Sequence, residues 1–108
     1  KELNVEFEYC YTDGIFDVDI IKNKSKRKQV FSASVEEFEL MAPKGDTQHL
    51  AIYSSLPVED LSSGEEKEGL YVFVSQYKGK KKKFIIEPCE EIKKAMRQDL
   101  ASRFILGG

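Results

Sequence analysis

The pair Asp13-Gly14 constrains this chain more than any other feature, because it predicts where a β-hairpin turns. Asp-Gly favours a two-residue turn with positive φ at both positions, and such a turn matches the twist of antiparallel strands. The flanking segments, Leu3 to Thr12 and Ile15 to Ile21, alternate apolar and polar side chains as half-buried strands do. The turn therefore predicts the register, with Thr12 opposite Ile15.

This register separates an apolar face from an acidic face. The apolar face pairs large side chains across the two strands: Phe7 with Ile20, Tyr9 with Val18, and Tyr11 with Phe16. The opposite face gathers four carboxylates: Glu6, Glu8, Asp17 and Asp19. Like charges placed opposite each other, as Glu8 and Asp19 would be, destabilise a sheet. The acidic face therefore needs a compensating partner or free access to solvent.

Three interpretations of the acidic face are open. The carboxylates are solvated or neutralised by Lys and Arg of a neighbouring element, they contact a basic partner surface, or they share a hard cation such as calcium. Hard-cation sites usually draw several ligands from one flexible loop, which this segment lacks. We therefore expect no metal here, and we keep Glu6, Glu8, Asp17 and Asp19 as candidate partner contacts.

The segment after the first hairpin changes character twice. Residues 22–28 are polar and basic, which indicates a loop, and residues 29–33 have the composition of a strand. Ser34 and Glu37 match a capping box, which predicts a short helix. Its inward residues would be Val35, Phe38 and Met41. A continued strand, which would align Phe38 with Leu40, is the alternative.

Three further elements complete the middle of the chain. Residues 49–54 are expected to form a short strand with Leu50 and Ile52 facing inward. Residues 55–69 have the composition of a mobile loop. Residues 70–77 and 80–87 are expected to form a second hairpin that turns at Lys78-Gly79, with Phe73 opposite Phe84, Tyr71 opposite Ile86 and Val72 opposite Ile85.

The C-terminal segment predicts an amphipathic helix from Pro88 to Ile105, followed by Gly107 as its C-cap. Its apolar stripe recurs every four residues: Ile92, Met96, Leu100 and Phe104. The expected fold class is α+β: an antiparallel sheet of five or six strands, curled or in two layers, with this helix packed on it. We expect a single globular domain over residues 1–108.

Length and composition support a globular domain and exclude several classes of protein. The chain has 108 residues, of which 41% are hydrophobic and 33% are charged. A net charge of −2 argues against a general polyanion binder but permits a local basic patch. No apolar run approaches the ~20 residues that cross a bilayer. The chain begins at Lys1, so we expect a domain from a longer protein, with any targeting or lipidation signal elsewhere.

Two basic runs are the candidate contacts for lipid or another anion: Lys22, Lys24, Lys26, Arg27 and Lys28, then Lys80, Lys81, Lys82 and Lys83. We expect both runs at hairpin or strand-connecting tips. There they could bind anionic lipid headgroups or nucleic acid phosphates, or protect strand edges from aggregation. No exposed aromatic stacking platform accompanies the lysines, which argues against nucleic acid.

No residue set indicates catalysis or a cofactor. His49 is the only histidine, no nucleophile motif accompanies it, and the seven glycines are scattered singly. Cys10 and Cys89 belong to no Cys-x-x-Cys pair. We expect two reduced, partly buried thiols, with a single bridge between them left open. The composition fits the reducing, cytoplasmic side of a membrane.

Two resemblances follow from these patterns. The sheet, the basic tips and the helix stripe of Ile92, Met96, Leu100 and Phe104 resemble pleckstrin-homology-like (PH-like) domains, although that family's helix tryptophan is missing and the first basic run follows the second strand. The run Tyr9-Cys-Tyr-Thr-Asp-Gly14, the sheet order and Ser102-Arg-Phe104 also look like the immune mapped proteins of apicomplexan parasites. That second resemblance implies the folded C-terminal domain of a lipid-anchored, membrane-associated antigen without known catalysis.

The sequence therefore favours a non-catalytic interaction or scaffold domain of a membrane-associated protein, which the second resemblance makes a parasite antigen. One alternative is a module that binds phosphoinositides or other anionic lipids. Another is a cation-binding module on the acidic face. The expected partner is an unidentified protein or an anionic membrane surface, reached through a lipid anchor outside this segment, and the oligomeric state is left open.

Overall fold

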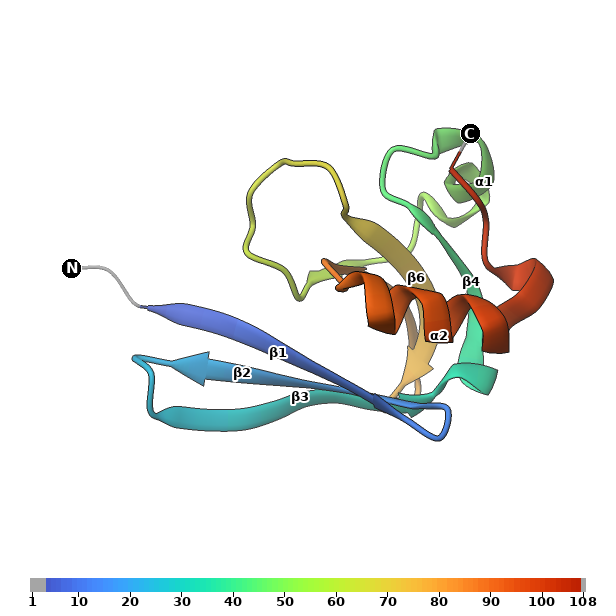
Figure 1. Cartoon of the computed structure of the whole chain (residues 1–108). Coiled ribbons are helices and arrows are strands. Elements are labelled where there is room, and N and C mark those ends of the chain that lie inside the picture. Colours follow the sequence, from blue (N-terminus) through green and yellow to red (C-terminus); the bar gives the residue numbers. More distant parts are fainter. Residues whose placement is uncertain (1–3, 108) are drawn as a thin grey trace.

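Two β-sheets and a C-terminal helix surround one hydrophobic core in the computed structural model, which describes residues 4–107 (Figure 1). The first sheet, in the order β1-β2-β3, contains Val5–Thr12, Ile15–Lys22 and Lys26–Ser34. The second, in the order β4-β6-β7-β5, contains Phe38–Pro43, Tyr71–Tyr77, Lys80–Ile86 and Val58–Asp60. The α+β class is thus confirmed in its two-layer form, with seven strands in place of the expected five or six.

Both predicted hairpins have the predicted register. Asp13 and Gly14 adopt φ values of 52° and 80°, and Thr12 lies opposite Ile15. At the second turn, Lys78 and Gly79 adopt 52° and 81°, and Phe73 of β6 lies opposite Phe84 of β7. Positive φ at both central residues gives these turns the twist of the strands that they connect.

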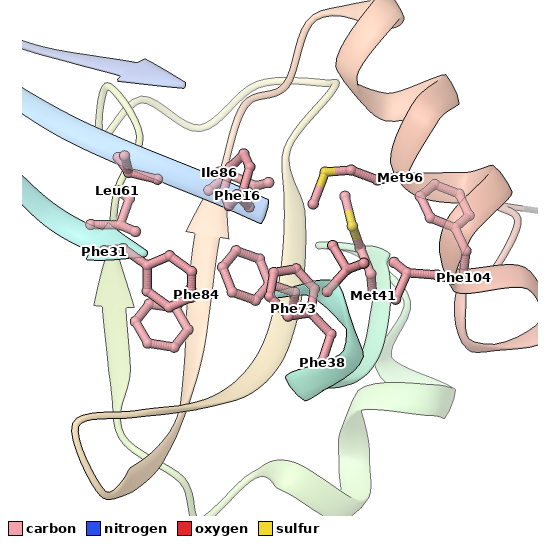
Figure 2. Close-up of a cluster of buried hydrophobic side chains, with 13 residues drawn as sticks. Phe16, Phe31, Phe38, Met41, Leu61, Phe73, Phe84, Ile86, Met96 and Phe104 are labelled. Atoms are coloured by element: carbon pink, nitrogen blue, oxygen red, sulfur yellow. The ribbon is translucent and has the colours of Figure 1, made fainter. Parts of the chain in front are cut away.

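The core between the sheets is built largely from phenylalanine (Figure 2). Phe16 and Phe31 of the first sheet and Phe38, Phe73 and Phe84 of the second are at most 1% exposed. Phe31 and Phe84 join the two layers, with ring centroids 4.7 Å apart, and Phe38 stacks on Phe73 at 4.1 Å. Aromatic pairs in such geometries add to the stability gained from the buried area itself.

The helix expected after Ser34 is wrong beyond its first turn. The Ser34 hydroxyl accepts a hydrogen bond from the Glu36 amide at 3.1 Å, but it caps only a 3-10 turn, Val35–Glu37. The chain then continues as β4, the alternative, with a bulge between Phe38 and Leu40. The bulge adds a residue to the strand, so Phe38 and Met41 both reach the core three residues apart. Buried residues three apart are also typical of a helix, which explains the wrong prediction.

The strand expected at residues 49–54 is also wrong, because this segment is helical. It contains α1, Thr47–Leu50, and a 3-10 turn, Ala51–Tyr53. The Asp46 carboxylate caps α1 by accepting a hydrogen bond from the His49 amide at 3.0 Å. As a result Ile52 is 78% exposed rather than inward, and the buried residue is Tyr53.

The segment expected to be a mobile loop, residues 55–69, contains the short strand β5. β5 pairs in parallel with β7, and Leu61, which follows it, is 2% exposed in the core. A composition rich in Ser, Glu and Gly hid this strand, because three residues are too few to show a period. The mobility of the remaining loop stays a prediction.

The C-terminal helix α2, Glu90–Leu100, is shorter than expected and begins after Pro88 with Cys89 as its N-cap. It ends where Ala101 adopts a φ of 54°, so Gly107 is not its cap, and a 3-10 turn, Ala101–Arg103, follows. The apolar stripe is confirmed: Met96, Leu100 and Phe104 are buried and Ile92 packs against the core cluster. Phe104 itself lies beyond the helix and bridges to Met41 of β4.

The two cysteines differ from the expectation in their burial. Cys10 and Cys89 are both free thiols and both exposed, so the expected partial burial is wrong and the optional bridge is not formed.

Candidate surface-docking site

The three-stranded sheet extends past the core at one end (Figure 1). Along its inner face the side chains change from fully buried, at Phe16 and Val18, to half-buried, at Phe7 and Ile20. Val5, nearest the end, is 39% exposed. The strands continue beyond the point where the opposing layer can cover them, because each is eight or nine residues long. This projecting end is the candidate site.

Four lysines surround the projecting end, and we call them the basic hairpin: Lys22, Lys24, Lys26 and Lys28. All four are exposed, and none has a carboxylate within 4.0 Å among residues 4–107. This part of the chain is a pair of strands and a turn, not the loop expected over residues 22–28.

The strand register puts three of these lysines on the inner face. Lys22 lies opposite both Val5 and Lys26, and Ile20 lies opposite both Phe7 and Lys28. Residues directly opposite each other on antiparallel strands point to the same side. The inner face therefore runs from the buried core, through the half-buried pair Phe7 and Ile20, to a cationic end.

Two positive φ angles and two backbone hydrogen bonds shape the turn at the end. Asn23 and Lys24 adopt positive φ values of 53° and 65°, and the Asn23 amide donates to the Asn4 carbonyl at 2.6 Å. The Ser25 amide donates to the Lys22 carbonyl at 3.2 Å, which closes the turn. The backbone thus presents Lys24 at the tip between the two strand lysines Lys22 and Lys26.

The outer face of the same sheet carries the acidic cluster together with side chains that bind its carboxylates. Arg27 of β3 donates to Glu8 at 2.5 Å and to Asp19 at 3.0 Å, and so separates the two carboxylates that face each other. Hydrogen bonds from Arg27 to these carboxylates raise the pKa of its guanidinium above the usual range. Ser32 donates to Asp17 at 2.5 Å. The neutralisation interpretation is therefore correct for Glu8 and Asp19.

This arrangement leaves little for a cation on the acidic face. Arg27 occupies the position between Glu8 and Asp19 that a shared ion would take. Over residues 4–107, no group of three or more His, Cys, Asp or Glu side chains is placed to hold a metal. Because Arg27 is paired with these two carboxylates, it differs from Lys22, Lys24, Lys26 and Lys28, which belong to the same basic run but have no such partner among residues 4–107. Glu6 stays exposed at the edge of the sheet.

The second basic run begins at the hairpin turn, as predicted, but then continues along β7. Lys80, Lys81, Lys82 and Lys83 form the first part of β7, inside the four-stranded sheet. Lys81 binds Glu39 at 2.9 Å and Lys82 binds Glu59 at 3.1 Å. Hydrogen bonds from Lys81 and from the Tyr53 hydroxyl lower the pKa of Glu39. The structure therefore does not join the two runs into one site, and of the four lysines Lys80 is exposed while the other three are half-buried.

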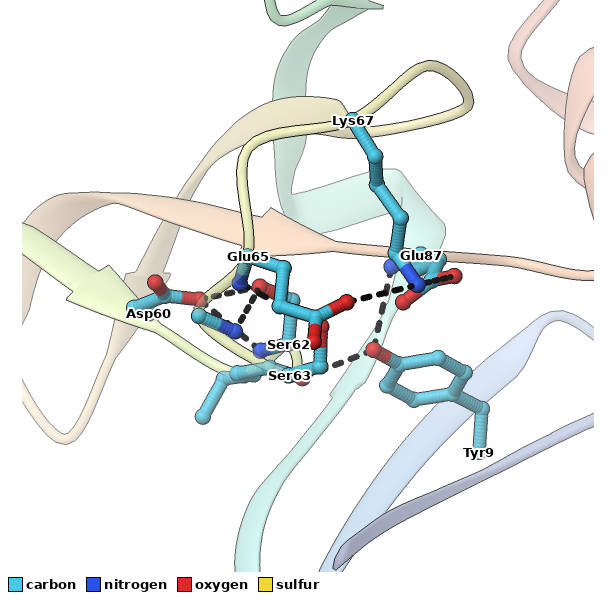
Figure 3. A network of polar contacts seen from close by, with 9 residues as sticks. Tyr9, Asp60, Ser62, Ser63, Glu65, Lys67 and Glu87 are labelled. Atoms are coloured by element: carbon cyan, nitrogen blue, oxygen red, sulfur yellow. Dashed lines mark hydrogen bonds and ion pairs between the residues drawn. The ribbon is translucent and has the colours of Figure 1, made fainter.

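A polar network holds the root of the projecting end in place (Figure 3). The Tyr9 hydroxyl donates to the Leu61 carbonyl at 2.7 Å and accepts from the Glu87 amide at 3.0 Å. Burial raises the pKa of Tyr9 to about 12. Lys67 binds Glu87 at 2.8 Å beside it. These contacts connect β1 to the loop before β6 and to the end of β7 at the base of the projecting end.

The sequence missed two residues of this surface, Phe7 and Ile20. Their pairing was predicted, but nothing in the pattern showed that the opposing layer stops short of them.

His49, the only histidine, lies in α1 with its Nδ1 2.9 Å from the Asp46 carboxylate. The cleft beside this pair, about 440 Å³ in volume, includes no Ser, Thr or Cys among its described lining residues.

A comparison with protein families matches residues 1–106 to the family described as Bacterial PH-like domain (DUF6106). No curated protein matches, and no solved structure matches. The family match supports the PH-like architecture expected from the sequence. It does not support the resemblance to apicomplexan immune mapped proteins, because the matched family is bacterial. Within the part of the chain that the structure describes, no helix is long and apolar enough to span a membrane.

Proposed function

This chain belongs to the bacterial PH-like domain family (DUF6106), and we propose that it is a non-catalytic interaction module that docks on anionic membrane surfaces through its basic hairpin. PH-like domains are generally non-catalytic and commonly bind proteins or lipids. The parasite-antigen interpretation has no observation in its favour and is not part of the proposal.

One observation carries the proposal: unpaired lysines and half-buried apolar side chains share one face of a projecting sheet. Lys22, Lys26 and Lys28 flank Phe7 and Ile20 in the strand register. Cations attract the sheet to anionic headgroups, while apolar side chains at the same depth reach the interface between headgroups and acyl chains. A purely solubilising set of lysines would not need the apolar pair.

The expected affinity is low and depends on salt. Each lysine near an anionic leaflet contributes about 1 kcal/mol, so the four together supply roughly 4 kcal/mol before the cost of association. A net charge of −2 opposes the approach of the whole domain. Charges more than about 8 Å apart are screened at physiological ionic strength. Stable attachment therefore requires a second contact, such as an acyl chain or a partner protein.

The test is flotation with phosphatidylserine-rich vesicles at low and at physiological ionic strength. The variant K22Q/K24Q/K26Q/K28Q should lose most of the low-salt recovery. The matched variant K80Q/K81Q/K82Q/K83Q removes the same charge from β7, where Lys81 and Lys82 are already paired, and should keep most of it. Equal losses in both variants would show a response to net charge alone and would contradict a site at the basic hairpin.

Selectivity for phosphoinositides is a finer possibility that the same assay resolves. The four lysines of the basic hairpin are exposed and spread over two strands and a turn, so we expect recovery to follow vesicle charge rather than headgroup identity. Vesicles with phosphatidylinositol bisphosphate, matched in total charge to the phosphatidylserine vesicles, should recover the wild-type chain equally well. A clear preference for the bisphosphate would replace this proposal with a headgroup-specific one.

A further inference from the structure

A second cleft lies far from the basic hairpin, between α2 and the C-terminal tail. Its volume is about 380 Å³, which is within the range of small-molecule sites. One wall is the exposed side of α2, and the other is the tail from Phe104 to Gly107, which turns back from the end of the helix (Figure 1). Tyr71, at the start of β6, also lines it.

The helical wall carries a net positive charge. Glu90, Lys93, Lys94 and Arg97 recur at spacings of three and four residues, which places them on one side of α2. Lys93 binds Glu90 at 3.0 Å and lies 5.3 Å from the centre of the Tyr71 ring. Lys94 and Arg97 have no carboxylate within 4.0 Å among residues 4–107. Two cations are thus free to bind an acid group.

The opposite wall and the base of the cleft are apolar. Leu106 is 58% exposed and lines the cleft, and Phe104 lies beside it with 7% exposure. The Tyr71 ring packs 5.7 Å from the Phe104 ring and is half-buried. An occupant that covers Leu106 and Tyr71 would gain from the burial of this surface. The cleft therefore offers an apolar surface next to unpaired cations.

We propose that this cleft binds a small amphiphilic acid, namely an aliphatic monocarboxylate of medium chain length. The carboxylate binds Lys94 and Arg97, and the aliphatic chain lies on Tyr71, Phe104 and Leu106. Charge complementarity selects the acid group, because the cleft is cationic in a chain of net charge −2. The volume suits one short chain rather than a two-chain lipid.

The tail argues against an extended peptide as the occupant. Peptides that add to a sheet gain affinity from main-chain hydrogen bonds to an open strand edge. Here the Ile105 amide already donates to the Met41 carbonyl at 2.8 Å, and Phe104 bridges to Met41, so the tail covers this part of the β4 edge. The cleft therefore offers side chains for recognition, which suits a small acid.

The test is titration of the isotope-labelled chain with octanoate, followed by the amide shifts of residues 93–97 and 104–107. Octanoate should saturate these shifts at millimolar concentrations or below. Acetate, which has the acid group without the chain, and octylamine, which has the chain with the opposite charge, should each bind at least tenfold more weakly. Each methylene beyond acetate should tighten binding by up to about fourfold while the chain still fits the cleft.

Two variants localise the site. K94E/R97E should weaken octanoate binding at least tenfold, and L106A should weaken it about threefold without affecting acetate. The control K78E/K80E makes the same change of charge at the exposed turn between β6 and β7, outside both proposed sites, and should leave octanoate binding unchanged. The proposal is overturned if octanoate does not saturate, if acetate binds equally well, if the control loses as much affinity as K94E/R97E, or if an acidic peptide binds the cleft tighter than octanoate.

Discussion

The Tyr9 hydroxyl lies 2.7 Å from the Leu61 carbonyl, a hydrogen bond that joins residues 52 positions apart and fixes the base of the projecting sheet. The same hydroxyl accepts a hydrogen bond from the Glu87 amide at 3.0 Å. One phenol thus pairs with a part-buried carbonyl and a part-buried amide from two other segments (Figure 3). These two hydrogen bonds connect β1 to the loop after β5 and to the end of β7.

Removal of the hydroxyl in Y9F should destabilise the fold by about 1–3 kcal/mol, because two backbone groups lose their partner while the ring stays in place. The measurement is a urea denaturation curve at neutral pH. Y77F, which removes the hydroxyl of another half-buried tyrosine for which no hydrogen bond is found within residues 4–107, is the control and should change little. A Y9F curve that matches the wild type would show that the network does not hold the base.

The pKa of Tyr9 predicts a loss of stability in alkali. Burial raises this pKa from 10.0 to about 12, so between these values the unfolded chain releases a proton that the folded chain keeps. The unfolded state then binds fewer protons, and the free energy of unfolding falls as pH rises from 10 towards 12. Denaturation curves across this interval should show a shallower fall for Y9F than for the wild type. Identical slopes would mean that the Tyr9 phenol titrates normally.

Arg27 should stabilise the first sheet because it separates two carboxylates that face each other. In R27Q, Glu8 and Asp19 face each other without a cation, so the fold should be less stable in a urea melt at pH 7. The double variant R27Q/D19N should regain part of the loss, because it removes one of the two like charges. A double variant that is no more stable than R27Q would assign the effect to packing of the Arg27 side chain.

The stripe on α2 provides a direct measure of helix docking. Leu100 is 1% exposed, so L100A removes buried methyl groups and should cost about 2–5 kcal/mol in a urea melt. Q98A, on the exposed side of the same helix, controls for helix propensity and should change stability by less than about 0.5 kcal/mol. A loss below half a kcal/mol for L100A would mean that α2 does not pack on the sheets.

Local signals predicted much of this fold. Asp13-Gly14 and Lys78-Gly79 predicted both hairpin registers, because a two-residue turn leaves one way to pair the flanking strands. The period of four in Met96, Leu100 and Phe104 likewise predicted the buried stripe. The hairpin registers and the helix stripe depend on residues close together in the sequence, so they can be predicted from the sequence alone.

The parts that failed depend on distant contacts. The bulge at Phe38 and Leu40 gave β4 a helical spacing, and only the pairing with β6 shows that it is a strand. β5 is a strand because it pairs in parallel with the free edge of β7. At the site, the lysines of residues 22–28 were found from the sequence, but their separation from Arg27, and the end of the core at Phe7 and Ile20, required the sheets to be in place.

The most direct test of the central proposal is to locate the membrane-facing surface with an environment-sensitive dye. The exposed thiols Cys10 and Cys89 are first changed to Ser, and a single cysteine is introduced as N23C, at the turn of the basic hairpin, or as Q98C, on α2. With phosphatidylserine-rich vesicles at low salt, the dye at position 23 should shift to the blue and that at position 98 should not. A blue shift at position 98 with none at position 23 would contradict docking through the basic hairpin.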